Sequence, residues 1–143
     1  MTSGIAHLDL VVCDLERSVA FYGELLAPLG WRTHGTIVGE RGEHVVYLQA
    51  AHGTQLGLRE PPAAAARPRP PDRYDVGMHH LAFGADSRDL VLDRARWLRD
   101  RGVRLESGPQ EYDYAPNYYS VFFFDPDGLK LEVLHLPGSG TGS

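Results

Sequence analysis

The sequence predicts an α+β fold made of two similar halves, each beginning with a strand and continuing with a helix and further strands. The first observation is a repeated histidine, His7 in IAHLDLVV and His80 in HHLAF. The second is a polar residue seven positions later, Asp14 or Ser87, which precedes an amphipathic run in both halves. The third is a glycine at the end of each run. Because chance histidines would not carry matching surroundings, these features indicate an internal repeat.

Each half is expected to contain one amphipathic helix. In the first half, apolar residues at steps of four and three predict a buried face of Leu15, Val19, Tyr22, Leu26 and Leu29. In the second half, the predicted buried side holds Leu90 or Val91, Arg94 or Ala95, and Leu98. Asp14 and Ser87 are the expected N-caps, and Gly30 and Gly102 the expected helix ends.

The repeat divides one predicted domain into two modules, residues 4–60 and 76–136. Between them, residues 61–75 form a proline-rich connector, because proline cannot donate to a sheet ladder. The tail, residues 137–143, has nothing apolar to bury and is expected to be flexible. Strands are expected in HVVYLQA, TQLGLRE, YYSVFFF and LKLEVLHL, with a turn at DPDG between the last two.

Composition narrows the classes of function. With 143 residues and 43% hydrophobic content the chain can bury one good core, but each module alone would be marginal, so the modules should share a sheet or exchange partners in a dimer. The net charge of −5 argues against a nucleic-acid partner. No apolar run approaches the roughly 20 residues of a membrane span. Without a signal-peptide pattern, and with Cys13 as the single cysteine, the expected location is the cytoplasm.

Three candidate metal ligands are predicted to share one face of the sheet. Successive side chains of a strand point to opposite faces, and the leucines, valines and phenylalanine that flank the candidates are expected to face the helices. The opposite face then receives His7, His80 and Glu132. By the same count His79 faces the helices, so His80 is preferred as the ligand.

Two neutral imidazoles and one carboxylate are suitable ligands for a divalent first-row metal, and they leave coordination positions open. These donors suit iron, manganese, nickel or zinc, so the identity of the metal stays open. Taken singly, each histidine also fits a hydrogen-bonded structural role, and Glu132 also fits a solvent-facing strand position. The repeat makes the three positions mutually informative.

The segments H-L-D-L-V-V-x-D-L-E-R-S-V-x-F-Y, H-H-L-A-F and V-F-F-F-D-P-D-G-L-K-L-E-V resemble the vicinal oxygen chelate superfamily. That superfamily groups glyoxalase I, bleomycin-resistance proteins, fosfomycin-resistance transferases and extradiol dioxygenases. The resemblance covers residues 4 to 136 and implies paired βαβββ modules, which form a curved mixed sheet around a central cup with helices on the outer face. It also implies a homodimer. His7, His80 and Glu132 match metal ligands of the first and last strands.

The resemblance implies a metal-dependent enzyme that chelates two oxygens of a small molecule, of the dioxygenase, lyase or isomerase, or transferase type. The alternative is a metal-free protein that sequesters a small molecule or antibiotic, as bleomycin-resistance proteins do. Glyoxalase I-like proteins carry a metal-binding glutamate in the fourth strand, where this sequence has Gly57. Because glycine can neither bind metal nor move a proton, this departure argues against glyoxalase I activity.

Further candidates line the same predicted site. Acid or base candidates are Asp9, beside the predicted metal, and three tyrosines of EYDYAPNYY, a segment expected to be a loop: Tyr112, Tyr114 and Tyr119. Candidate substrate-binding residues are Arg59, for an anionic group, with Gln55, Tyr47, Tyr118 and Phe122. The tyrosines equally fit a packing surface or the aromatic wall of a binding protein, and Arg59 equally fits a solvent-exposed edge.

Overall fold

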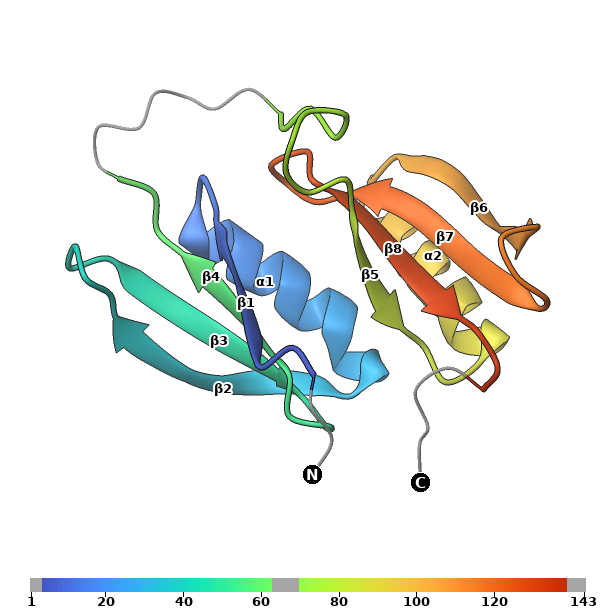
Figure 1. The fold of residues 1–143 in the computed structure, drawn as a ribbon, viewed down its shortest axis with the longest axis horizontal. Coiled ribbons are helices and arrows are strands. Elements are labelled where there is room, and N and C mark those ends of the chain that lie inside the picture. The colour runs from blue at the N-terminus through green and yellow to red at the C-terminus, as the bar shows by residue number, and fades with distance from the viewer. Residues whose placement is uncertain (1–3, 63–69, 139–143) are drawn as a thin grey trace. The chain divides into compact units, whose positions relative to one another are not determined.

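The structure, a computed structural model, describes residues 4–62 and 70–138. The chain divides into two compact units, residues 1–69 and 70–143 (Figure 1). Each unit contains a strand, a helix and three more strands, so the predicted α+β class with paired βαβββ modules is confirmed. The central cup and the homodimer concern the placement of modules and chains, and they stay predictions. Much of the predicted connector (63–69) and of the predicted tail (139–143) lies outside the described residues.

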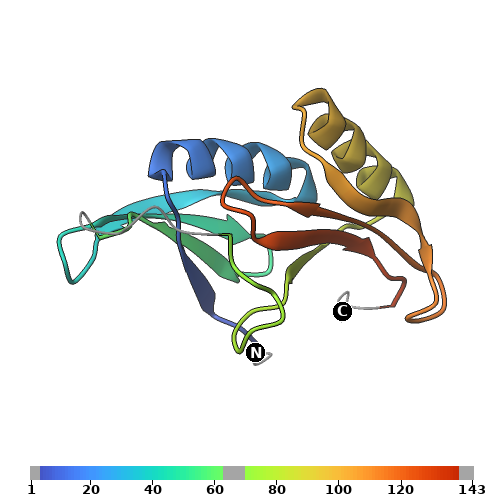
Figure 2. The ribbon, with the colours of Figure 1, turned by 90° about the horizontal axis from the view of Figure 1, so that it is seen from above.

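The first unit is a four-stranded mixed sheet with one main helix. Its elements are β1 (His7–Val11), α1 (Leu15–Leu26), the 3-10 turn η1 (Ala27–Leu29), β2 (Trp31–Val38), β3 (His44–Ala50) and β4 (Gln55–Arg59). The strand order is β1-β4-β3-β2, and β1 and β4 are parallel. Figure 2 shows α1 along one face of this sheet. The parallel pairing places the first and last strands of the unit side by side.

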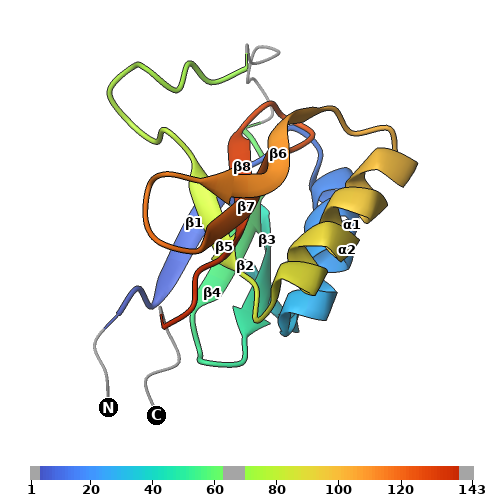
Figure 3. The ribbon, with the colours of Figure 1, turned by 90° about the vertical axis from the view of Figure 1, so that its right-hand side faces the viewer.

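The second unit repeats this topology. Its elements are β5 (Leu81–Gly84), α2 (Arg88–Asp100), β6 (Leu105–Tyr112), β7 (Tyr118–Phe124) and β8 (Lys130–His135), in the sheet order β5-β8-β7-β6. Figure 3 shows α2 running along one face of the sheet. β6 lies at the edge of the sheet and, among the described strands, pairs only with β7. Proline has no backbone N–H to donate, and this edge position tolerates it at Pro109 because the outer side of an edge strand forms no ladder.

α1 begins at its predicted cap but ends at Leu26, so the predicted stop Gly30 ends η1 instead, and only part of the predicted buried face is buried. Asp14 accepts a hydrogen bond from the backbone N–H of Arg17 at 3.0 Å, as an N-cap does. The residues that α1 buries are Ser18, Phe21, Tyr22, Leu25 and Leu26. Of the predicted face, Tyr22 and Leu26 are buried as expected, whereas Leu15, Val19 and Leu29 are only half-buried. Phe21 and Leu25 provide the remaining buried surface on the neighbouring side, and Leu29 lies in η1.

In α2, both the predicted N-cap and the predicted buried face are confirmed. Ser87 Oγ accepts a hydrogen bond from the N–H of Leu90 at 3.1 Å. The residues that α2 buries are Val91, Arg94, Ala95 and Leu98. Within the described ranges, neither helix is long and apolar enough to cross a bilayer.

The turn before β8 also matches its sequence. Asp125 Oδ1 accepts hydrogen bonds from the N–H groups of Asp127 and Leu129, at 2.9 and 2.8 Å. Gly128 has a φ of 89°, a left-handed conformation that favours glycine. This closed turn sets the register of β8 against β7, in which Glu132 pairs with Phe122.

Candidate functional site

A buried carboxylate meets a histidine in the second unit. Glu132 lies in the middle of β8 and is 1% exposed, while His80 immediately precedes β5. His80 Nε2 lies 3.2 Å from Glu132 Oε2. Tyr118 donates a short hydrogen bond to the other oxygen, Oε1, whereas Oε2 has no hydrogen-bond partner among the described residues. His80 Nε2 and Glu132 Oε2 therefore form an ion pair without the geometry of a hydrogen bond. Both atoms are of the kinds that bind metals.

Burial and the hydrogen bond to Glu132 raise the pKa of the Tyr118 hydroxyl above its usual range. The hydroxyl therefore stays protonated at neutral pH and remains a donor. A buried carboxylate needs such donors, because water no longer solvates its charge.

His79 contacts His80 and does not face the helix, contrary to the prediction. Its Nδ1 lies 2.7 Å from His80 Nδ1, and its side chain is exposed. The alternation rule fails here because both histidines precede β5, which begins at Leu81. A contact at Nδ1 leaves Nε2 of His80 facing Glu132, and this is how a neighbouring group selects the nitrogen available to a metal.

Aromatic side chains adjoin this pair. The rings of Tyr112 and Tyr114 are stacked 5.3 Å apart, and Tyr114 also contacts Tyr118 edge-on at 5.2 Å. Phe122 contacts both Tyr112 and the ring of His80, at 5.3 and 6.0 Å. The predicted loop is shorter than expected, since Tyr112 ends β6 and Tyr118 begins β7.

Tyr119 lies apart from this aromatic cluster. As the neighbour of Tyr118 in β7, its side chain points to the opposite face of the sheet. There the guanidinium of Arg88, at the start of α2, lies 4.8 Å from the ring centroid of Tyr119.

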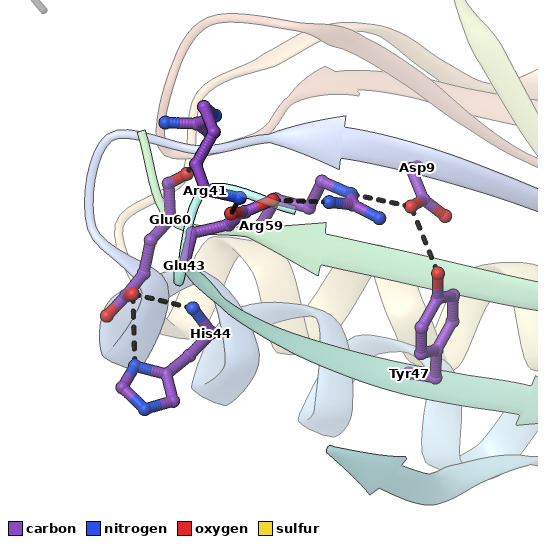
Figure 4. Close-up of polar contacts among 7 residues, drawn as sticks. All are labelled: Asp9, Arg41, Glu43, His44, Tyr47, Arg59 and Glu60. Carbon is purple, nitrogen blue, oxygen red and sulfur yellow. Dashed lines mark hydrogen bonds and ion pairs between the residues drawn. The ribbon is translucent and has the colours of Figure 1, made fainter. Parts of the chain in front are cut away.

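A polar network occupies the corresponding face of the first unit (Figure 4). Asp9 Oδ2 accepts hydrogen bonds from Tyr47 Oη at 3.0 Å and from Arg59 Nε at 2.7 Å. Arg59 Nη1 also donates to Glu43 Oε1 at 2.6 Å. Arg59, predicted to bind an anionic group, is therefore held between two carboxylates of its own chain. The hydrogen bond to Asp9 raises the pKa of Arg59.

His7 and the second oxygen of Asp9 lie next to this network. The ring of His7 meets the edge of Tyr47 at 6.2 Å, so the predicted first ligand adjoins the network. Asp9 Oδ1 is buried and has no hydrogen-bond partner in the described part of the chain. Asp9 pairs with Gly57 across the parallel strands, and Gln55 pairs with His7 in the same register.

Gly57 is enclosed by this network. A Cβ at this position would lie 2.4 Å from Asp9 Oδ1 and 2.7 Å from Tyr47 Cε1. Asp9 and Tyr47 therefore fill the space in which any longer side chain at position 57 would begin.

Comparison with known proteins identifies the family. The Glyoxalase/Bleomycin resistance protein/Dioxygenase superfamily matches residues 4–133. The chain belongs to this superfamily. A superfamily domain from Frankia sp. EAN1pec shares the fold, with a TM-score of 0.78 at 24% identity over 94% of this chain and 98% of that one.

Relatives of the chain include two kinds of named enzyme. The chain is 26% identical over 132 residues to metallothiol transferase FosB of Staphylococcus epidermidis, covering 92% of this chain and 80% of the relative. It is 29% identical over 140 residues to lactoylglutathione lyase of Salmonella typhimurium, covering 96% of each. The superfamily thus includes a transferase and a lyase at similar distances from this chain.

The donor atoms of the second unit fit the divalent metals that superfamily members use. The observation that tests this fit is the buried Oε2 of Glu132, which pairs with His80 Nε2 but has no hydrogen-bond partner within the described residues, because an ion would satisfy that oxygen. Over residues 4–62 and 70–138, no group of three histidine, cysteine, aspartate or glutamate side chains is arranged to hold a metal. His80 and Glu132 form the part of the predicted ligand set that one unit brings together, and metal binding stays a prediction.

Sequence reasoning missed Glu43 and the role of His79. Glu43 precedes β3 and is 6% exposed, with Oε2 accepting from the N–H of Arg41 at 2.8 Å. Hydrogen bonds from its own backbone N–H and that of Arg41 lower the pKa of Glu43. No motif surrounds it in the sequence. Only the register of β3 with β4, in which Val45 pairs with Arg59, would have indicated that it reaches Arg59.

Proposed function

We propose that this protein is a metal-dependent enzyme acting on a small molecule, with His7, His80 and Glu132 as metal ligands. The observation that carries this proposal is the buried Oε2 atom of Glu132, which has no hydrogen-bond partner among the described residues and forms an ion pair with His80 Nε2 at 3.2 Å. Burying a carboxylate oxygen without a partner costs free energy, and a bound cation offsets that cost. His7 is proposed from its matching place in the repeat.

A divalent metal held by these residues would supply a Lewis acid for two neighbouring oxygens of a substrate. The chain's own groups have separate tasks. Tyr118 holds Oε1 of Glu132, and His79 contacts Nδ1 of His80, so both ligands are oriented by a second residue. The exposed Tyr114, stacked on Tyr112, offers an aromatic surface for the substrate.

The reaction type depends on the groups that complete the metal site. The relatives named metallothiol transferase and lactoylglutathione lyase support metal-dependent chemistry on small molecules. Gly57 cannot supply the fourth-strand carboxylate expected of a glyoxalase I mechanism. Transferase, dioxygenase and other lyase or isomerase activities are therefore the reactions to assay, with iron, manganese, nickel or zinc as the metal.

The test is the metal content of purified protein, measured by elemental analysis beside His7→Ala and Glu132→Gln variants. We expect near-stoichiometric metal in the native protein and little in either variant. His34→Ala, which changes an exposed histidine of β2, is the matched control and should keep its metal. Native protein that takes up no divalent metal would exclude the proposal.

A second candidate function is metal-free sequestration of an aromatic small molecule. It is favoured by the ring cluster of Tyr112, Tyr114, Tyr118 and Phe122. A protein that binds aromatic compounds equally well with and without chelator, and that loses this binding in Tyr114→Ala, would support the binding protein over the enzyme.

A further inference from the structure

A lysine lies at one end of the aromatic cluster in the second unit. Lys130 begins β8, and its side chain is only 13% exposed. Its Nζ lies 4.6 Å from the centroid of the Phe122 ring, which is a cation–π contact. Lys130 and Glu132 are two residues apart in β8, so they share one face of the sheet, while Leu131 points to the other. The ammonium group therefore lies on the same face as the buried carboxylate.

Two cations share one carboxylate at this end of the cluster. Lys130 Nζ lies 3.5 Å from Glu106 Oε1, whereas Arg73 Nη1 lies 2.7 Å from Glu106 Oε2. The arginine is thus the closer partner of Glu106, and the bond from Lys130 uses one of its three ammonium hydrogens. A largely buried ammonium whose partner is distant and shared is incompletely neutralised. A further anion beside Lys130 would stabilise it.

The ring of Phe122 connects this ammonium group to the rest of the site. Its centroid lies 6.0 Å from that of His80 and 5.3 Å from that of Tyr112. Lys130 and His80 therefore adjoin the same ring, and one small molecule can reach both. Tyr112 continues the aromatic surface to the exposed Tyr114, on which it is stacked. A ligand that matches this surface carries a negative group at one end of a flat aromatic body.

From these observations we infer that the ligand of this site is a small aromatic acid and that Lys130 binds its carboxylate. The inference rests on the proposed small-molecule site, and it applies whether the protein acts on the ligand or sequesters it. The ammonium group would donate a charge-assisted hydrogen bond to the acid, while the rings of Phe122 and the tyrosines contact its body. Glu106 competes with the acid for the same ammonium group and so limits the affinity.

The experiment compares benzoate with benzamide, which share a ring and differ in charge. Calorimetric titrations use protein that has been freed of metal by a chelator and then dialysed, so that neither metal nor chelator competes. We expect the native protein to prefer benzoate by about 10- to 100-fold. Lys130→Met keeps the length of the side chain without its charge and should lose this preference. Equal affinities of the native protein for the two compounds would overturn the inference, as would a preference that survives in Lys130→Met.

Glu106→Gln tests the inference in the opposite direction. Removing the competing carboxylate should tighten the binding of benzoate and leave that of benzamide unchanged. The matched control is Glu111→Gln in the same strand, because Glu111 pairs with Arg88 on the other face of the sheet. Benzoate binding that is unchanged or weaker in Glu106→Gln would contradict the role given to Lys130.

Lys130 is the only lysine in the sequence, so protein made with isotope-labelled lysine reports on this one side chain by NMR. Benzoate should shift its signal, and benzamide should shift it much less. If calorimetry detects benzoate binding while the lysine signal stays in place, the acid binds elsewhere and the inference is wrong. Melting temperatures establish that each variant is folded.

Failure of this inference can be told apart from failure of the proposed function. A protein that contains metal but does not distinguish benzoate from benzamide keeps its metal site and has no site for an aromatic acid. A protein that takes up no metal but prefers benzoate through Lys130 has the acid site and is not a metal-dependent enzyme.

Discussion

Tyr118 donates a hydrogen bond to one oxygen of Glu132, and His80 lies beside the other oxygen without the geometry of a hydrogen bond. The two sides of this carboxylate therefore differ. One is satisfied within the protein, and the other faces a second potential ligand atom.

Tyr118→Phe should destabilise the metal-free protein by about 1–3 kcal/mol, because both oxygens of a buried carboxylate would then lack donors. The free energy of unfolding from urea denaturation in chelator measures this. Tyr114→Phe removes the hydroxyl of a tyrosine that is 69% exposed, and it should change stability much less. Equal effects of the two substitutions would contradict the importance of the bond to Glu132.

Gly57→Ala should also destabilise the protein, by about 1–3 kcal/mol, because the added methyl group would overlap Asp9 and Tyr47. The control is Gly35→Ala in β2, where a Cβ would have no heavy atom within 4 Å. Urea denaturation of both variants distinguishes close packing at position 57 from a general cost of replacing a strand glycine. A fully stable Gly57→Ala protein would show that Asp9 moves aside freely.

Arg59→Met should lower the urea midpoint of the protein without any ligand present, because it leaves the carboxylates of Asp9 and Glu43 side by side without their shared cation. Arg41→Met removes the same charge from a side chain whose hydrogen bond to the Glu60 carbonyl is exposed, and it should have a smaller effect. If Arg59 serves mainly to bind an anionic substrate, substrate affinity will fall while the urea midpoint stays unchanged.

Glu43 should make stability fall in acid. Because its pKa is lowered in the folded protein, its stabilising contribution is present above the ordinary value of 4.5 and is lost as pH falls through the lowered pKa. Urea midpoints of the native protein and of Glu43→Gln should therefore converge as pH falls below about 4.5. A gap that stays constant from neutral pH to pH 3 would show that protonation of Glu43 is not responsible.

Local structure was largely predictable from the sequence because its causes are local. The side chains of Asp14 and Ser87 cap the helices as expected, and β3 and β7 have the predicted bounds, His44–Ala50 and Tyr118–Phe124. The buried face of α1 was predicted only in part, because apolar residues flank the predicted stripe on one side and periodicity alone cannot choose between two adjoining stripes.

The candidate site was predictable only in part. Counting alternate residues placed Glu132 opposite its apolar neighbours, on the face where the structure has Tyr118 and Phe122. The count failed for His79 because that residue lies outside a strand. The partners of Arg59 depend on strand register and on a turn conformation, and neither is encoded by nearby residues. Long-range ion pairs of this kind require the assembled sheet.

In each module the last strand to be synthesised lies inside the sheet, with β4 between β1 and β3 and β8 between β5 and β7. A ribosome that has produced residues 1–124 has therefore made three strands of the second sheet, but not the one that joins β5 to β7. Until β8 emerges, β5 has no hydrogen-bonded neighbour in its sheet, and its polar backbone is open to misplaced pairing. Glu132 lies on the strand that completes the second sheet. The nascent chain therefore cannot bury this carboxylate before all four strands have paired.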